Sequence, residues 1–251
     1  MKRARVAYAG AIHEAYPDVA GLRLADGRVL SEDKVVWLPP VEAATIVALG
    51  LNYADHAKEL KLGAQDEPLV FLKGPGTLIG HRGQTRRPRD ASFMHYECEL
   101  AVVIGATARN VHRDAAQEVI AGYTVANDYA IRDYLENYYR PNLRVKNRDT
   151  CTVLGPWLVD RGDIEDAANL TLRTCVNGVK TQEGNTRDLV FAIPYLVEYL
   201  TSFMTLGRGD VILTGTPEGV VNVDVGDEVV TEIEGVGRLV NTIVGDEVFA
   251  R

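Results

Sequence analysis

Apolar residues in this chain gather in short runs of strand length, and long helical stripes are rare. The strand-like runs are Thr45 to Leu49, Leu69 to Leu72, Leu100 to Ile104, Val211 to Leu213 and Glu228 to Ile233. The turn residues Gly235-Val236-Gly237 follow the last run and predict a closing hairpin. The pattern as a whole predicts a fold that is mainly β with some α.

The first forty residues have a pattern of their own. The segment VAGLRLADGRVL alternates apolar and polar side chains around the turn signal Asp26-Gly27, and Pro39-Pro40 then interrupts the chain. We therefore expect a small N-terminal β subdomain over residues 1–40 and a larger domain over residues 41–251.

One clear amphipathic helix is expected, over Asp188 to Met204. Its apolar face repeats at helical spacing, and Asp188 is a suitable residue to cap its start. The residues of this face are Ile193, Leu196, Val197, Leu200 and Met204. Such a stripe indicates packing against a core.

Composition narrows the possible partners. The 251 residues carry a formal net charge of -8, with a pI near 5.2, which argues against broad attraction to nucleic acid or to anionic membrane surfaces. Neither a signal-peptide pattern nor a run of membrane-spanning length is present, so a cytoplasmic protein is expected. The three cysteines, Cys98, Cys151 and Cys175, lack a disulfide-framework spacing and are expected to be buried thiols.

The segment HYECELAVVIG places acidic side chains next to one another. Alternation along a strand projects His95, Glu97 and Glu99 to one face. Two carboxylates about 5 Å apart repel by roughly 3 kcal/mol at an effective dielectric of about 20, and a hard divalent cation would reverse that cost. Asp128 follows a second apolar run and could complete a three-carboxylate site. Taken singly, the Glu pair also suits a solvated strand face, and Asp128 a turn or cap.

A second candidate lies in GLNYADHAKEL. His56 and Glu59 are three residues apart and share a face if this segment is helical. The pair suits a general base whose imidazole is oriented by a carboxylate. An exposed polar helix turn is the alternative.

Basic residues gather in RDYLENYYRPNLRVKNRD, although the chain is acidic overall. The cluster consists of Arg132, Arg140, Arg144, Lys146 and Arg148, with Tyr134, Tyr138 and Tyr139 between them. The planar fork of arginine suits carboxylate recognition, and a charged loop is the alternative. In ILTGTPEGV, a strand ends in a glycine-rich turn whose backbone amides and Thr216 hydroxyl could hold an anionic oxygen.

Together these segments resemble the fumarylacetoacetate hydrolase family, whose members carry GxNYxxHxxE, an ExE strand, a distal Asp, a Lys and a TGTPxG turn in this order. The resemblance runs from about Leu49 to about Val244. It implies a mixed β-sandwich roll in a catalytic domain over residues 41–251, which would bind Mg²⁺ or Mn²⁺. It also implies a homodimer. The implied metal ligands are Glu97, Glu99 and Asp128, the catalytic residues His56, Glu59 and Lys146, and the substrate contacts Arg132, Tyr134, Arg140, Arg144 and Thr216.

Within the family, the segment from Ala121 to Asp149 and the later NLTLRTCVNG and EGVGRLVN look most like the isomerase/decarboxylase branch of homoprotocatechuate catabolism. That likeness implies decarboxylation of 5-oxopent-3-ene-1,2,5-tricarboxylate, isomerisation of 2-hydroxyhepta-2,4-diene-1,7-dioate, or both. The substrate would be a 2-oxo acid with additional carboxylates. A C-C bond hydrolase acting on acylpyruvates or fumarylpyruvate is the enzymatic alternative, and a metal-binding structural module is the alternative without turnover.

Overall fold

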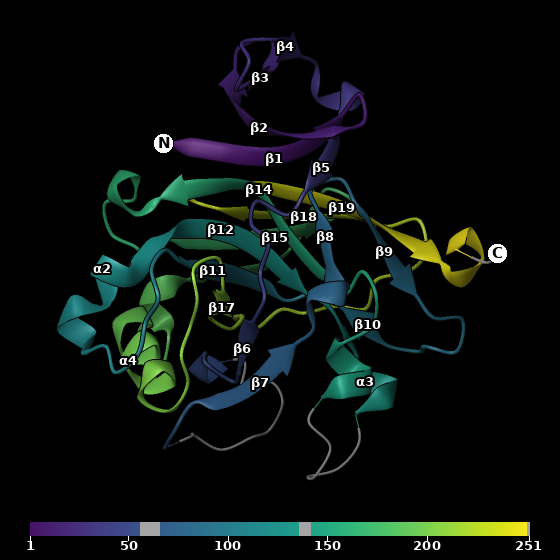
Figure 1. The fold of residues 1–251 in the computed structure, drawn as a ribbon. Coiled ribbons are helices and arrows are strands. Elements are labelled where there is room, and N and C mark those ends of the chain that lie inside the picture. The colour runs from purple at the N-terminus through teal and green to yellow at the C-terminus, as the bar shows by residue number, and fades with distance from the viewer. Residues whose placement is uncertain (56–65, 136–141, 250–251) are drawn as a thin grey trace.

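The computed structural model describes residues 1–55, 66–135 and 142–249, and most of its regular structure is β (Figure 1). The N-terminal strands are β1 (Lys2–Tyr8), β2 (Ala11–Asp18), β3 (Gly21–Leu24), β4 (Val29–Leu30) and β5 (Val36–Leu38). The strands that follow are β6 (Ile46–Gly50), β7 (Leu69–Lys73), β8 (Leu78–Gly80), β9 (Gln84–Arg87), β10 (Met94–His95), β11 (Cys98–Ile104), β12 (Ile120–Asp128), β13 (Ala130–Ile131), β14 (Thr152–Asp160), β15 (Thr171–Val176), β16 (Val179–Asn185), β17 (Val211–Leu213), β18 (Glu228–Ile233) and β19 (Gly237–Gly245). The α-helices are α2 (Ala116–Val119), α3 (Leu143–Lys146) and α4 (Ile193–Phe203).

Two sheets stack to form the body of the molecule. The large sheet runs in the order β4-β3-β2-β1-β14-β12-β11-β17-β6-β7, and the smaller one in the order β16-β15-β18-β19-β9. The smaller sheet packs on β11, β12 and β14 (Figure 1). This arrangement confirms the expected mainly β fold of the sandwich type.

The alternation of β11 separates two apolar layers. Cys98, Leu100 and Val102 belong to the main core, which also contains the inward side chains of the smaller sheet. Ala101 and Val103 face the opposite side, where a second cluster lies against β6 and β17. Glu99 shares the parity of this second face, so the candidate metal ligands point away from the main core.

The N-terminal strands enclose a small core of their own, formed by Ala4, Val6, Ala15, Leu22, Leu24 and Trp37. β1 pairs with β2 and β5 and also with β14, which ties this region to the large sheet. The boundary near residue 40 stays a prediction.

Helix α4 corrects the expected helix boundary. It begins at Ile193, Pro194 lies in its first turn, and Asp188 ends a separate 3-10 turn and does not cap the helix. The predicted face is otherwise observed, because Ile193, Leu196, Val197 and Leu200 are buried. The turn at Gly235 connects β18 to β19 as an antiparallel hairpin, as expected.

The cysteines Cys98 and Cys151 are buried free thiols, whereas Cys175 is only half-buried. No helix of the described chain has both the length and the apolar character needed to cross a membrane.

Candidate active site

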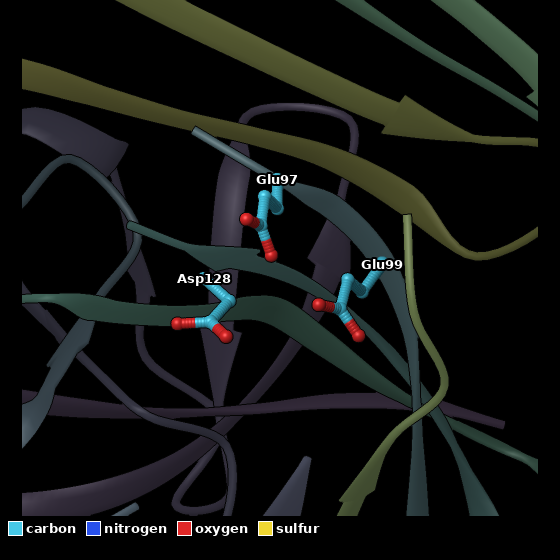
Figure 2. Close-up of side chains that lie close together, drawn as sticks. All are labelled: Glu97, Glu99 and Asp128. Atoms are coloured by element: carbon cyan, nitrogen blue, oxygen red, sulfur yellow. The ribbon is translucent and has the colours of Figure 1, made fainter. Parts of the chain in front are cut away.

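Three carboxylates converge at the end of two neighbouring strands (Figure 2). The backbone N–H of Asp128 donates to the carbonyl oxygen of Glu97 over 2.9 Å, and the antiparallel register of β11 and β12 continues from this contact. Residues directly opposite in such a ladder project to the same face, and Glu99 shares that face because it lies two residues after Glu97. The register therefore assembles a cluster that no single segment contains.

The cluster has the donor set of a hard cation site. One carboxylate oxygen from each of Glu97, Glu99 and Asp128 lies within 4.8 Å of the others, and all three residues are buried. Burial raises the pKa of Glu99 well above its usual value, and the neighbouring charges of Asp128 and Glu97 raise it further. Because oxygen ligands and excess negative charge both favour a divalent cation, these residues fit such an ion.

Two buried lysines offset part of this charge. Nζ of Lys146 lies 2.5 Å from Glu97 Oε2 and 2.9 Å from Asp128 Oδ2. Burial lowers the pKa of Lys146, but the charges of Asp128 and Glu97 more than compensate, so that its pKa is raised overall. Lys73, at the end of β7, donates to Asp128 Oδ1 and to the carbonyl oxygen of Lys146.

The sequence reasoning did not identify Lys73. Its side chain is completely buried, although lysine is rarely buried without a partner. The one available signal was its position at the end of the apolar run LVFLK, where a core-facing lysine needs a carboxylate.

The glycine-rich turn contacts a metal-ligand candidate. The backbone N–H of Gly215 donates to Glu99 Oε2, so this amide holds a protein carboxylate in the role that the sequence suggested for a substrate oxygen. Gly215 has a φ of +99°, and a Cβ there would come within 2.9 Å of Asn52 Cβ. Only glycine combines that backbone conformation with so close an approach.

A cavity of about 190 Å³ opens beside the carboxylates. Its polar lining consists of Glu97, Arg132, Asn142, Lys146 and Thr216, and its apolar lining includes Leu49, Leu69, Phe71, Leu135 and Val145. The Thr216 hydroxyl accepts a hydrogen bond from Gln182 Nε2 over 2.9 Å, which leaves its own hydrogen able to donate into the cavity. A small anionic ligand would thus meet cations and a hydroxyl next to the candidate metal ligands.

Arg132 is fixed by a buried histidine. Its Nε donates to His95 Nε2 over 2.7 Å, and its Nη2 lies 3.7 Å from Glu97 Oε1. Burial lowers the pKa of His95 to about 3, so the ring is neutral at physiological pH.

Two further predicted substrate contacts, Arg144 and Tyr134, are described by the structure. Arg144 is exposed and stacks over the Tyr134 ring at 4.0 Å, and the Tyr134 hydroxyl donates to Asp90 Oδ1 over 2.5 Å. Neither residue is among those that line the cavity. His56, Glu59 and Arg140 lie outside the described residues.

The sequence of this chain is highly similar to those of curated bifunctional enzymes. The 4-hydroxyphenylacetate degradation bifunctional isomerase/decarboxylase of Salmonella dublin is 57% identical over 233 residues, covering 90% of this chain and 54% of the relative. The homoprotocatechuate catabolism bifunctional isomerase/decarboxylase of Escherichia coli is 56% identical over 224 residues, covering 89% and 52%. The chain thus spans about half the length of these relatives.

Solved structures of enzymes with the same fold are also similar to this chain. The 5-carboxymethyl-2-hydroxymuconate delta-isomerase of Mycobacterium smegmatis is 37% identical with a TM-score of 0.87, covering 98% of this chain and 99% of the other. The maleylpyruvate hydrolase of Sphingobium sp. SYK-6, in complex with manganese(II) and pyruvate, is 26% identical with a TM-score of 0.83, covering 98% and 99%. The fumarylacetoacetate (FAA) hydrolase C-terminal family profile matches residues 45–244, and we conclude that the chain belongs to the fumarylacetoacetate hydrolase family.

Proposed function

We propose that this protein is a divalent-metal-dependent enzyme of homoprotocatechuate catabolism that decarboxylates 5-oxopent-3-ene-1,2,5-tricarboxylate, isomerises 2-hydroxyhepta-2,4-diene-1,7-dioate, or does both. The observation that carries the proposal is the meeting of Glu97, Glu99 and Asp128 with Arg132 and Lys146 beside one cavity. The identity to isomerase/decarboxylases supports this choice of substrate class within the family.

Glu97, Glu99 and Asp128 would hold Mg²⁺ or Mn²⁺, which supplies Lewis-acid stabilisation of the negative charge that develops at a 2-oxo group. The protein's own groups bind and orient the substrate. Arg132 and Lys146 place positive charge at the cavity wall, where a carboxylate of the substrate can pair with them. The Thr216 hydroxyl can donate to a substrate oxygen, and the apolar wall excludes water from the reacting carbons.

In this proposal His56 and Glu59 carry out proton transfer, and this assignment rests on the sequence motif alone. Isomerisation needs one group that removes a proton from carbon and returns it to another carbon, which suits an imidazole oriented by a carboxylate. His56→Ala should keep the metal and lower turnover on the order of 10²-fold or more. Wild-type turnover in that variant would exclude the role.

Hydrolysis of an acylpyruvate is the second candidate. The similarity to the maleylpyruvate hydrolase favours this candidate, because a protein of the same fold is named as a hydrolase. In that reaction the His56/Glu59 pair would activate water instead of moving a substrate proton. A metal-binding structural module without turnover would leave the cavity-lining Arg132 and Thr216 without a role.

Product analysis separates these candidates. Purified protein is given the tricarboxylate, the dienedioate or an acylpyruvate with Mg²⁺, with Mn²⁺ or with EDTA. We expect CO₂ release or isomerisation that EDTA abolishes. Preferred cleavage of the acylpyruvate would establish the hydrolase, and no turnover with any metal would leave the structural module. A homodimer in the cytoplasm completes the proposal, and sedimentation velocity tests the dimer.

A further inference from the structure

We infer that His95 is a positioning residue that holds the Arg132 guanidinium in the orientation needed to bind the carboxylate of a 2-oxo acid beside the metal. The inference deepens the proposed function and rests on it.

The backbone places the two residues together. β10 and β13 form a two-stranded ladder in which His95 pairs with Ala130, and the Arg132 N–H donates to the Phe93 carbonyl oxygen over 2.9 Å. The ladder is anchored beyond its end, because Asp133 accepts from the backbone N–H groups of Ser92 and Phe93, both over 2.9 Å. The backbone of Arg132 is therefore held at a fixed position relative to His95.

Hydrogen bonding then determines one tautomer of the imidazole. Arg132 Nε always carries a hydrogen, so His95 Nε2 must accept, over 2.7 Å. The proton must reside on Nδ1, which donates to the carbonyl oxygen of Tyr96 over 3.0 Å. Both ring nitrogens are satisfied inside the protein, and the ring is completely buried. His95 does not line the cavity, and it is hydrogen-bonded to one residue that does, Arg132. Its Nδ1 also lies 3.7 Å from Glu97 Oε1, so the Mn²⁺ affinity has to be measured together with the pyruvate affinity.

The consequence is a guanidinium anchored by its inner nitrogen. Nε is engaged by His95, Nη2 lies 3.7 Å from Glu97 Oε1, and Arg132 is among the residues that line the cavity. Glu97 is a candidate metal ligand, so the carboxylate within reach of Arg132 is the one next to the metal. A planar guanidinium binds a carboxylate well only when its plane is correctly oriented.

Two substitutions of His95 test the role of Nε2 as the hydrogen-bond acceptor for Arg132. Asparagine in His95→Asn can replace Nδ1 but is too short to reach Arg132, whereas glutamine in His95→Gln can bring its carbonyl oxygen to the position of Nε2. Calorimetry measures the Kd of Mn²⁺ and then the Kd of pyruvate on the Mn²⁺-loaded protein. We expect His95→Asn to weaken pyruvate binding about ten- to hundredfold, as for a lost charge-assisted hydrogen bond, with unchanged Mn²⁺ affinity. His95→Gln should restore most of the pyruvate affinity.

A double-mutant cycle tests whether His95 acts through Arg132. In an Arg132→Met background, His95→Asn should cause less than a twofold further loss of pyruvate affinity. Additive losses, or equal pyruvate affinities for the Asn and Gln variants, would overturn the inference. His81→Gln controls for the loss of a buried histidine elsewhere, since His81 accepts from the Val240 N–H and does not line this cavity.

The outcomes also separate this inference from the proposed function. If the wild-type protein binds neither Mn²⁺ nor pyruvate, the proposed function fails, and the inference fails with it. If it binds both and His95→Asn binds pyruvate equally well, only the inference fails. Should His95→Asn not fold, the Gln variant with and without Arg132→Met completes the test, since low pyruvate affinity in the folded Gln variant contradicts the inference.

Discussion

The buried carboxylate cluster and Arg144 of the arginine-rich segment both carry charge, yet they differ in surroundings. Glu97, Glu99 and Asp128 are buried, Lys73 contacts Asp128, and Lys146 contacts both Asp128 and Glu97. In the described part of the arginine-rich segment, residues 132–135 and 142–149, Lys146 is buried against the carboxylates and Arg132 lines the cavity. Arg144 is exposed and lies over an aromatic ring.

Exposure to solvent determines how strongly these charges interact. Buried charges interact strongly because water does not screen them, and each one requires a partner. Exposed charges are screened, and a single exposed interaction contributes about 0 to 1 kcal/mol. On this comparison we expect substitutions in the buried cluster to change metal binding and stability more than substitution of the exposed arginine.

The largest effect is expected for Glu99→Ala, which removes one of the three candidate metal ligands. Substitution of a residue that only orients a metal ligand lowers metal affinity about 10- to 100-fold. Loss of a ligand itself should therefore weaken Mn²⁺ binding by more than that. Isothermal titration calorimetry measures the Kd, and Glu118→Ala, which removes an exposed carboxylate, serves as the control. Unchanged affinity in Glu99→Ala would show that the cluster is not the metal site.

Lys73→Met should destabilise the metal-free protein by about 3 to 5 kcal/mol, because it leaves Asp128 without one of its buried cations. Urea unfolding in EDTA measures this loss. Lys180→Met breaks an exposed pair with Glu183 and should change stability by less than about 0.5 kcal/mol. Equal effects of the two substitutions would contradict the contrast between buried and exposed charge.

The pH dependence of stability should reveal the raised pKa of Glu99. A carboxyl whose pKa is higher in the folded state contributes stability below its unfolded value, near 4.5, and loses it as the pH rises through the folded value. The free energy of unfolding of the metal-free protein should therefore fall as the pH increases above about 4.5. Glu99→Gln should flatten this trend, and a slope identical to that of the wild type would argue against Glu99 as its source.

The smallest effect is expected for Arg144→Ala. The family resemblance implied that Arg144 is a substrate contact, and loss of a charge-assisted hydrogen bond to substrate would lower the specificity constant for the tricarboxylate by roughly ten- to a hundredfold. The observed stacking on Tyr134 suggests instead a stability change of about 0.5 to 1 kcal/mol, with the specificity constant changed by less than about threefold. Steady-state kinetics on the tricarboxylate and an acylpyruvate decides between the two. A tenfold loss confined to the tricarboxylate would restore Arg144 as a selectivity residue.

Local patterns were sufficient to predict much of this protein. The alternation in HYECELAVV placed Glu97 and Glu99 on one face because side-chain direction along a strand has a period of two residues. The main strands, the closing hairpin and the apolar face of α4 followed from periodicity and turn residues in the same way. The helix start at Ile193 was missed because Pro194 in the first turn determined the boundary, and Asp188 did not.

Only the tertiary structure decided which distant groups meet. The register of β11 with β12 brought Asp128 opposite Glu97, and the end of β7 brought Lys73 to Asp128 across 55 positions of sequence. The same holds for the Gly215 amide on Glu99 and for the contact between His95 and Arg132. The physical reason is that strand period is a property of each segment, whereas pairing register and burial depend on how the whole chain closes its core.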